Sequence, residues 1–237
     1  NVWAWIHRWM LRRIVKKLAT NCTEMFTITK TEGKETDECF GTKSIILTKG
    51  IDYSKRTFDG RAPHTPIRMV YTGNLLIGRA TSLCAISRAL KEINKDGVKV
   101  TFDIYTPTVL DGASTKLLNS NGCTKHAFVP KEQVADIQKN ADIVVFVESL
   151  EKDHKYDARL SFSTKLTDYF ASGKCIFAIG DKAIAPIQYL EEYDCAITCN
   201  NYGDVEGQLR KLIDNPTKIT EYGRKAFDIG RLNHEES

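Results

Sequence analysis

From residue 67 to residue 230 the chain alternates between two patterns of apolar residues. Short apolar runs predict strands at 67–71, 98–105, 126–129, 141–147, 175–179 and 195–199. The segments between them repeat apolar residues at helical spacing, which predicts helices at 81–95, 109–119, 185–192, 204–214 and 217–229, one that starts at 130–132, and one that follows Ser163-Thr164 and runs through 172–173. Strands that alternate with helices in this way require a parallel sheet with right-handed crossovers. We therefore predict an α/β domain over residues 67–237, an open doubly wound parallel sheet of the Rossmann-like type.

Residues 1–66 do not continue this alternation. The pattern predicts an amphipathic helix over 2–19, strands over 24–29 and 43–48, and a linker up to residue 66. One helix and two strands cannot enclose a core of their own. We expect this segment to be the last βαβ piece of a preceding domain that is incomplete here.

Composition and cysteine usage exclude several classes of protein. The 237 residues are 42% hydrophobic and 27% charged, which is typical of a globular protein, and no run of eighteen apolar residues occurs. The seven cysteines are scattered without a C-x-x-C pair, so we expect reduced, buried thiols, a cytoplasmic location and no metal site.

The net charge is unevenly distributed. The whole chain carries +4, whereas the helix at 2–19 alone carries +5 from Arg8, Arg12, Arg13, Lys16 and Lys17. Because the main domain is balanced, we expect no nucleic-acid partner. The basic helix has two interpretations, a peripheral contact with an anionic membrane or packing of its apolar side into the preceding domain. Its three tryptophans, spread around the helix, favour packing.

Two cations stand at the start of predicted helices, where a cation is unfavourable. Arg79 ends the loop after the first strand, and Lys165 lies in the first turn of the helix that begins near Ser163 and Thr164. Free N–H groups at a helix start attract anions, so cations placed there indicate a bound phosphate. Asp168 follows one turn later and would suit a ribose diol. The alternative is a capped helix with an exposed ion pair.

The order of five segments resembles the C-terminal, nucleotide-sugar-binding domain of GT-B glycosyltransferases, most closely the group 1 (GT4-like) family. The segments are Val70–Asn74 with Gly78-Arg79, Phe102–Tyr105, Ala127–Glu132, Asn140–Ile143 and Ser163–Lys174. The likeness covers about residues 44–237. It implies that residues 67–237 bind the donor and that residues 1–66 end the N-terminal domain and form the interdomain linker.

The resemblance also implies roles for individual residues. The donor diphosphate would contact Gly73, Asn74, Arg79, Ser163, Thr164 and Lys165, and the ribose would contact Asp168. The base would be framed by Tyr105, Phe128 and Val129. The family often has another acid eight positions before the ribose ligand, where this chain has Leu160, and Glu148 and Asp157 are candidates to replace it. Neither a metal nor a cofactor is implied besides the nucleotide-sugar itself.

The implied reaction is transfer of a sugar from a nucleotide-sugar to a hydroxyl of a saccharide or a lipid-linked acceptor, in polysaccharide or glycolipid biosynthesis. The acceptor-side catalytic groups would lie in the N-terminal domain, so we expect this chain alone to bind donor weakly and to lack turnover. Two alternatives stay open. One is a GT-B epimerase, for which His64, His126 and His154 are candidates by residue type alone. The other is a non-catalytic nucleotide-binding or assembly module.

Overall fold

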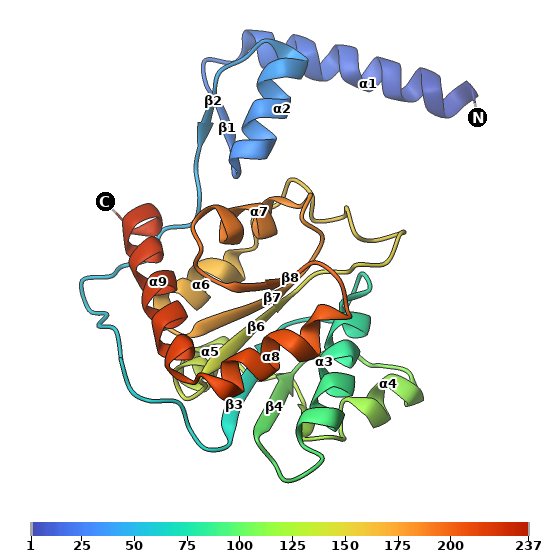
Figure 1. The fold of residues 1–237 in the computed structure, drawn as a ribbon. Coiled ribbons are helices and arrows are strands. Elements are labelled where there is room, and N and C mark those ends of the chain that lie inside the picture. The colour runs from blue at the N-terminus through green and yellow to red at the C-terminus, as the bar shows by residue number, and fades with distance from the viewer. Residues whose placement is uncertain (1, 237) are drawn as a thin grey trace. The chain divides into compact units, whose positions relative to one another are not determined.

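The computed structural model describes residues 2–236 as two compact units (Figure 1). The first unit contains the chain up to Thr48 together with Leu160–Phe162. The second contains Lys49–Arg159 and the chain from Ser163 onward.

The first unit has βαβ connectivity. Helix α1 (Val2–Asn21) precedes strand β1 (Met25–Thr27), helix α2 (Lys30–Phe40) and strand β2 (Ser44–Ile46), and the two strands pair in parallel. Helix α2 was not predicted individually, because its sequence is almost entirely polar. It is instead defined by its ends: Thr29 Oγ1 accepts a hydrogen bond from the N–H of Glu32 at 3.0 Å, and Gly41 closes the helix at a φ of 71°.

Helix α1 exposes its apolar side chains. Ala19 is its one buried residue among those described, whereas Trp3 is 79% exposed. The predicted packing of its apolar side into the preceding domain stays a prediction. In the range 2–236, no helix combines the length and the apolar character that crossing a bilayer requires.

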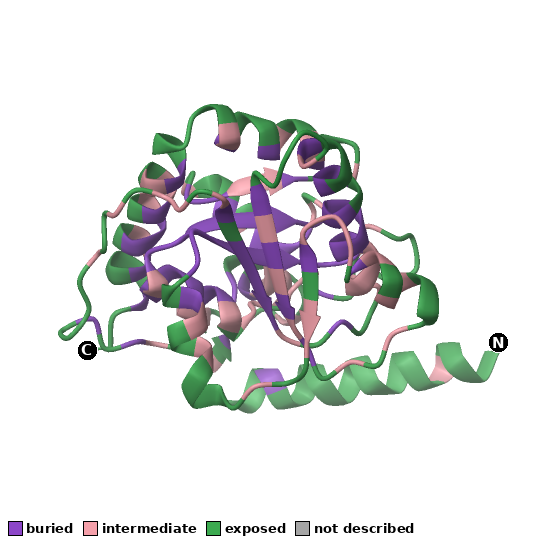
Figure 2. Cartoon of the chain, turned by 90° about the horizontal axis from the view of Figure 1, so that it is seen from below, coloured by how far each residue is buried: buried purple, intermediate pink, exposed green. Residues whose placement is uncertain are grey.

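The second unit is built on a six-stranded parallel sheet, as the alternation predicted. The strand order is β5-β4-β3-β6-β7-β8, with every neighbouring pair parallel. The strands are β3 (Ile67–Thr72), β4 (Val100–Tyr105), β5 (Cys123–His126), β6 (Ile143–Val147), β7 (Cys175–Ile179) and β8 (Ile197–Cys199). Every residue of β6 and β7 is buried, which explains why these two strands read as continuous apolar runs (Figure 2).

Helices cover both faces of this sheet (Figure 1). Helix α3 packs against α4 and α8, and α6 packs against α5 and α9. Their bounds are α3 (Arg79–Ile93), α4 (Gly112–Leu117), α5 (Lys131–Lys139), α6 (Thr164–Ser172), α7 (Ala185–Glu192), α8 (Asp204–Asp214) and α9 (Thr217–His234). This is the doubly wound arrangement.

One local prediction differs from the structure. The third strand was predicted at 126–129, but β5 is Cys123–His126, because its register pairs it with Phe102–Tyr105 of β4.

Residues 49–66, predicted to form the interdomain linker, are part of the second unit, and their role as a linker stays a prediction. Ile51 and Tyr53 are buried against Ala171 and Phe227, and the N–H of Ile51 donates to the carbonyl of His234 at 2.8 Å.

Candidate functional site

The sheet has its topological switch point between β3 and β6, where the chain turns from one half of the sheet to the other. In such sheets ligands bind beyond the carboxyl ends of the strands at this point. Gly73 follows the end of β3, and Glu148 follows the end of β6. The fold therefore places the loop from Gly73 to Arg79 beside the first turn of α6.

A cavity of about 370 Å³ opens beyond the carboxyl ends of the strands at the switch point. Most residues predicted to bind the donor line it, although they come from four separate segments of the chain. The predicted residues in its wall are Gly73, Asn74, Tyr105, Phe128, Val129, Thr164, Lys165 and Asp168. Arg79 and Ser163 lie outside the wall. The structure thus gathers the predicted residues in space, while their roles toward a ligand stay predictions.

Lys165 is the cation that faces the cavity. Its Nζ lies 4.4 Å from the centre of the Tyr71 ring and occupies the space that a side chain at position 73 would fill, which explains the glycine there. Among the described residues, the ammonium has no carboxylate within ion-pair distance. Burial, and after it the positive charge of Arg79, lower the pKa of Lys165 to about 8, while Glu148 acts in the opposite direction.

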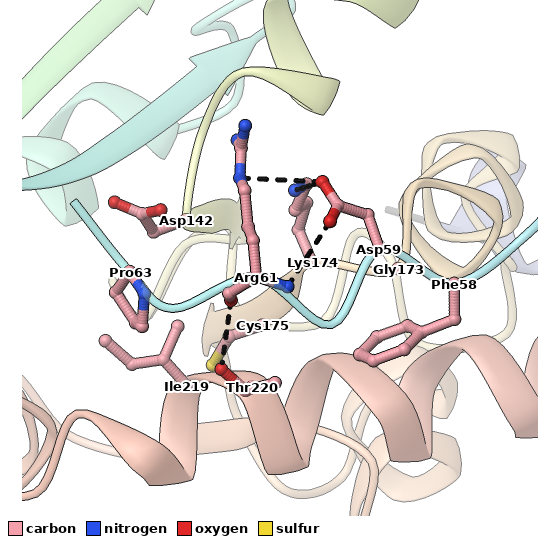
Figure 3. A pocket seen from close by; sticks show the side chains of 10 residues that line it. All are labelled: Phe58, Asp59, Arg61, Pro63, Asp142, Gly173, Lys174, Cys175, Ile219 and Thr220. Carbon is pink, nitrogen blue, oxygen red and sulfur yellow. Dashed lines mark hydrogen bonds and ion pairs between the residues drawn. The ribbon is translucent and has the colours of Figure 1, made fainter.

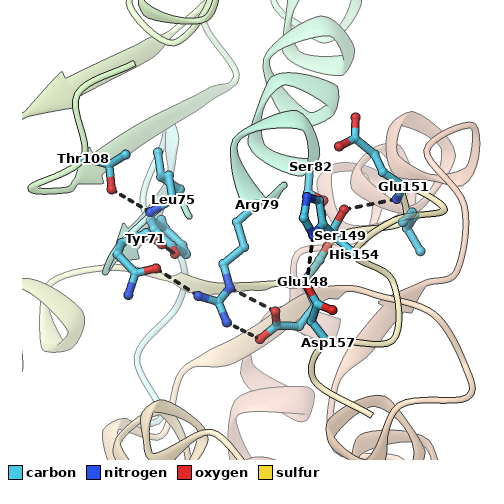
Figure 4. A network of polar contacts seen from close by, with 12 residues as sticks. Tyr71, Leu75, Arg79, Ser82, Thr108, Glu148, Ser149, Glu151, His154 and Asp157 are labelled. Carbon is cyan, nitrogen blue, oxygen red and sulfur yellow. Dashed lines mark hydrogen bonds and ion pairs between the residues drawn. The ribbon is translucent and has the colours of Figure 1, made fainter. Parts of the chain in front are cut away.

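Arg79 is held by an acid rather than free. Its Nε and Nη2 donate to the Glu148 carboxylate at 2.9 and 3.0 Å (Figure 4). Its Nη1 donates to Asn74 Oδ1 at 2.9 Å. Burial lowers the pKa of Arg79, but the hydrogen-bonded Glu148 carboxylate more than offsets this and holds the pKa above its ordinary value. Arg79 was predicted as a direct phosphate ligand; the structure places it beside the cavity, with one edge of its guanidinium already occupied.

The other end of the cavity is aromatic. Phe128 is 66% exposed at its rim, and Tyr105 stacks on His126 with ring centroids 4.5 Å apart and an angle of 15°. His126 Nε2 lies 2.6 Å from an oxygen of Asp103, so this histidine is engaged in supporting Tyr105. Flat rings at this end suit stacking with a planar base.

Asp168 lines the cavity but already has a partner. Lys49, from the segment predicted to be the linker, forms an ion pair with its carboxylate at 2.5 Å. Ser163 is the N-cap of α6 and makes no capping hydrogen bond with its side chain, although its carbonyl accepts from the N–H of Leu166. The first amides of α6 therefore have no side-chain cap.

Sequence reasoning missed several residues of this site. Tyr71, Thr72 and Gln138 were not singled out, yet Gln138 Nε2 donates to Thr72 Oγ1 at 3.1 Å inside the wall. Glu148 was named only as a substitute for the acid absent at Leu160, and Lys49 was not named at all. An acid directly after a fully apolar strand was the available signal for Glu148, because a charge there must be paired.

The remaining candidates by residue type lie elsewhere. His154 Nδ1 pairs with Asp157 at 2.9 Å in an exposed loop. His64 Nδ1 lies 2.8 Å from the buried Asp142. Asp142 lines a hollow of about 20 Å³ at the amino ends of the strands (Figure 3). Leu160 belongs to the first unit and is not in the cavity wall. None of these groups joins the switch-point cavity.

Comparison with known proteins bears on the fold. No protein-family model matches the sequence, and no curated protein matches it. Solved structures do match: TarM aligns over 94% of this chain with a TM-score of 0.70 and 13% identity, and Anabaena HepE in complex with UDP-glucose aligns over 94% with a TM-score of 0.65 and 11% identity. The C-terminal domain of the glycosyl transferase group 1 family protein LpcC from Francisella tularensis aligns over 79% with a TM-score of 0.57 and 12% identity.

The six-stranded unit has the fold of a Rossmann-like C-terminal domain of the GT-B type. This confirms the resemblance at the level of the fold, because the LpcC domain is matched over its whole length and is itself a C-terminal domain. The chain spans 43% of the length of TarM and 63% of the length of HepE. Assignment to the GT4 subfamily stays a prediction.

Proposed function

We propose that this chain is the donor-binding part of a glycosyltransferase that moves a sugar from a nucleotide-sugar to an acceptor hydroxyl. The observation that carries the proposal is the cavity at the carboxyl edge of the sheet, where the Lys165 ammonium sits against Gly73 with no carboxylate beside it among the described residues. The GT-B fold supports it, and HepE, one of the similar structures, was determined with UDP-glucose.

The wall of the cavity suggests how a nucleotide diphosphate would lie. Lys165, the uncapped amides at the start of α6 and the remaining N–H groups of Arg79 would hold the diphosphate. The base would stack at the end formed by Phe128, Val129 and Tyr105. Asp168 would accept hydrogen bonds from the ribose hydroxyls, and Lys49 forms an ion pair with the same carboxylate.

In the proposed reaction the bond between the anomeric carbon and the diphosphate oxygen breaks, and a bond from the acceptor oxygen to that carbon forms. The electron pair of the broken bond leaves with the diphosphate, and the proton of the acceptor hydroxyl passes to a base among the acceptor-side groups. Lys165 and the amides of α6 would stabilise the negative charge that develops on the departing group, without a resident metal. The acceptor-side groups are proposed to lie outside this chain.

A second proposal concerns the setting, which we infer to be polysaccharide or glycolipid biosynthesis in the cytoplasm. Helix α1 combines exposed Trp3, Trp5 and Trp9 with a cationic face, which would favour a peripheral contact with an anionic membrane. Sedimentation with vesicles of anionic or of neutral lipid tests this. Binding to the anionic vesicles that Trp3→Ala weakens supports the contact, and equal recovery with both vesicle types contradicts it.

The decisive experiment for the donor site is a calorimetric titration of the chain with UDP, GDP and ADP. We expect selective binding of one nucleotide, weakened by Lys165→Ala and by Arg79→Ala. Failure of all three nucleotides to bind would favour the assembly module. Binding accompanied by interconversion of a nucleotide-sugar with its epimer would favour the epimerase.

A further inference from the structure

Glu148 is fixed at the switch point by its backbone as well as by its side chain. Its N–H donates to the carbonyl of Ile179 on β7 at 2.8 Å, and its carbonyl accepts from Ser82 Oγ on α3 at 2.7 Å. The residue is only 5% exposed. Its carboxylate is therefore presented from a rigid point between a central strand and a helix.

This carboxylate takes one edge of the Arg79 guanidinium and leaves the other free. A guanidinium has five N–H groups, and Glu148 and Asn74 together accept three hydrogen bonds from Arg79. Two N–H groups remain for a ligand, because no further partner of this side chain occurs in the described range 2–236. Glu148 itself is not part of the cavity wall, so it does not occupy the place of an anion.

The two cations of the site are connected through the residues between them. Asn74 accepts from Arg79 through its side chain, and its carbonyl accepts from the Tyr71 hydroxyl at 2.5 Å. The Tyr71 ring in turn faces the Lys165 ammonium. Arg79 and Lys165 lie near enough that the charge of Arg79 lowers the pKa of Lys165, and Glu148 is the nearby acid that raises it.

We propose that Glu148 is a positioning residue of the phosphate site, which fixes the guanidinium of Arg79 and, as the counter-ion of Arg79, lets this cation stand next to the cavity that Lys165 lines. The identity of the ligand in this inference rests on the proposed function. The interaction of Glu148 with the nearby cations does not. Two cations beside one cavity repel each other until an anion arrives. A buried acid behind them reduces that repulsion without blocking the cavity.

Three variants separate the parts of this role. Glu148→Gln keeps the size of the side chain and removes its charge. Glu148→Asp keeps the charge and loses the reach to both nitrogens of Arg79. Glu151→Gln is the matched control, because this acid lies in the same loop and binds Thr81 Oγ1 at 3.1 Å on the same helix.

The first measurement needs no ligand. The ¹³Cε shift of Lys165 is followed against pH by NMR, with Lys165→Met to assign the signal. The groups that face this ammonium are Tyr71 on β3, Arg79 on α3 and Glu148 after β6, with Asp168 and its partner Lys49 one turn along α6. We expect Glu148→Gln to move the Lys165 titration to lower pH, while Glu148→Asp and Glu151→Gln leave it near the wild-type midpoint. An unchanged midpoint in Glu148→Gln overturns the counter-ion role.

The second measurement is calorimetric binding of inorganic pyrophosphate and of UDP across the same pH range. Glu148→Asp is expected to weaken pyrophosphate binding about tenfold at every pH, because Arg79 is no longer held at two points. Glu148→Gln is expected to shift the alkaline loss of binding to lower pH. Wild-type affinity in Glu148→Asp overturns the positioning role. If the wild-type chain binds neither probe, the proposed function fails, and the NMR titration still decides the role of Glu148.

Discussion

Two lysines with a lowered pKa, at opposite ends of the strands of the same sheet, show what distinguishes a binding cation from a structural one. Lys165 lies beyond the carboxyl ends of the strands and Lys174 lies at their amino ends. Burial lowers the pKa of both lysines. Lys174, 5% exposed in its side chain, has the Asp59 carboxylate 3.9 Å from its Nζ and faces a hollow of only about 20 Å³. Lys165 has an aromatic ring, a glycine and a cavity of about 370 Å³.

The difference lies in the space beside each ammonium and in its charge balance. At the amino edge, the Nη2 of Arg61 donates to the carbonyl of Lys139 at 2.9 Å, and Asp142 accepts from the backbone N–H groups of His64 and Arg68. These contacts hold the segment around Arg61 against the sheet. A desolvated cation therefore indicates a ligand only where room is left for one and no acid neutralises it directly.

The largest effect is expected from filling the space at position 73. In Gly73→Val the new side chain would collide with the Lys165 ammonium, and the φ of 148° is unfavourable for valine, so pyrophosphate binding should be abolished. Gly97→Val is the matched control, because its φ is 118° but its surroundings are open. Both variants should lose about 1–3 kcal/mol in chemical unfolding. Equal binding losses in the two would show that strain alone is responsible.

Neutralising each lysine tests the comparison directly. Lys165→Met should weaken pyrophosphate and UDP binding about thirtyfold, since a charge-assisted contact is worth about 2 kcal/mol. Lys174→Met should leave both affinities within about twofold of wild type, because its ammonium faces Asp59 at the other edge. Calorimetry with both ligands measures this. An equal loss of affinity in Lys174→Met and Lys165→Met would contradict the assignment of Lys165 as the binding cation and Lys174 as a structural one.

Rising pH should weaken pyrophosphate binding at Lys165 but increase the contribution of Lys165 to the free energy of unfolding. The pKa of Lys165 is lowered from 10.5 to about 8, so the ammonium that attracts phosphate disappears as pH rises through 8. Pyrophosphate affinity should then fall about tenfold between pH 7 and pH 9. Between pH 8 and 10.5 the unfolded chain binds more protons at this residue, so the Lys165 contribution to unfolding free energy should rise with pH.

Titrations of wild type and Lys165→Met separate this group from the others that ionise in the same range. The difference between the two proteins should contain both the alkaline loss of pyrophosphate affinity and the rise in unfolding free energy. If pyrophosphate affinity falls at alkaline pH in Lys165→Met as it does in wild type, another residue causes the fall.

The sequence predicted the order of the elements better than the pairing of charges. Cys175–Ile179 was predicted with its observed bounds, because a strand buried on both faces leaves an unbroken apolar run. For β5, the outermost strand of the sheet, an apolar run was a wrong guide. The apolar residues of the predicted strand at 126–129 belong to the loop that rims the cavity. The partnership of Arg79 with Glu148 spans 69 positions. Spacing could place each residue at the switch point but could not tell which opposite charges meet there.

The smallest effect is expected at the aromatic end, and it tests whether the cavity takes a whole nucleotide. Phe128 projects at the rim and is 66% exposed, so Phe128→Ala should remove little packing and leave the unfolding free energy unchanged within error. If a base stacks there, UDP affinity should fall about fivefold, from a stacking contribution of about 1 kcal/mol, while pyrophosphate affinity stays at the wild-type value. Leu232→Ala, at a residue 75% exposed on α9 and outside the cavity, controls for loss of surface apolar area. An equal fall for UDP and pyrophosphate in Phe128→Ala would mean that the variant disturbs the phosphate end. No fall for UDP would leave the phosphate end as the sole source of nucleotide affinity, and the aromatic wall would then have no part in recognising the base.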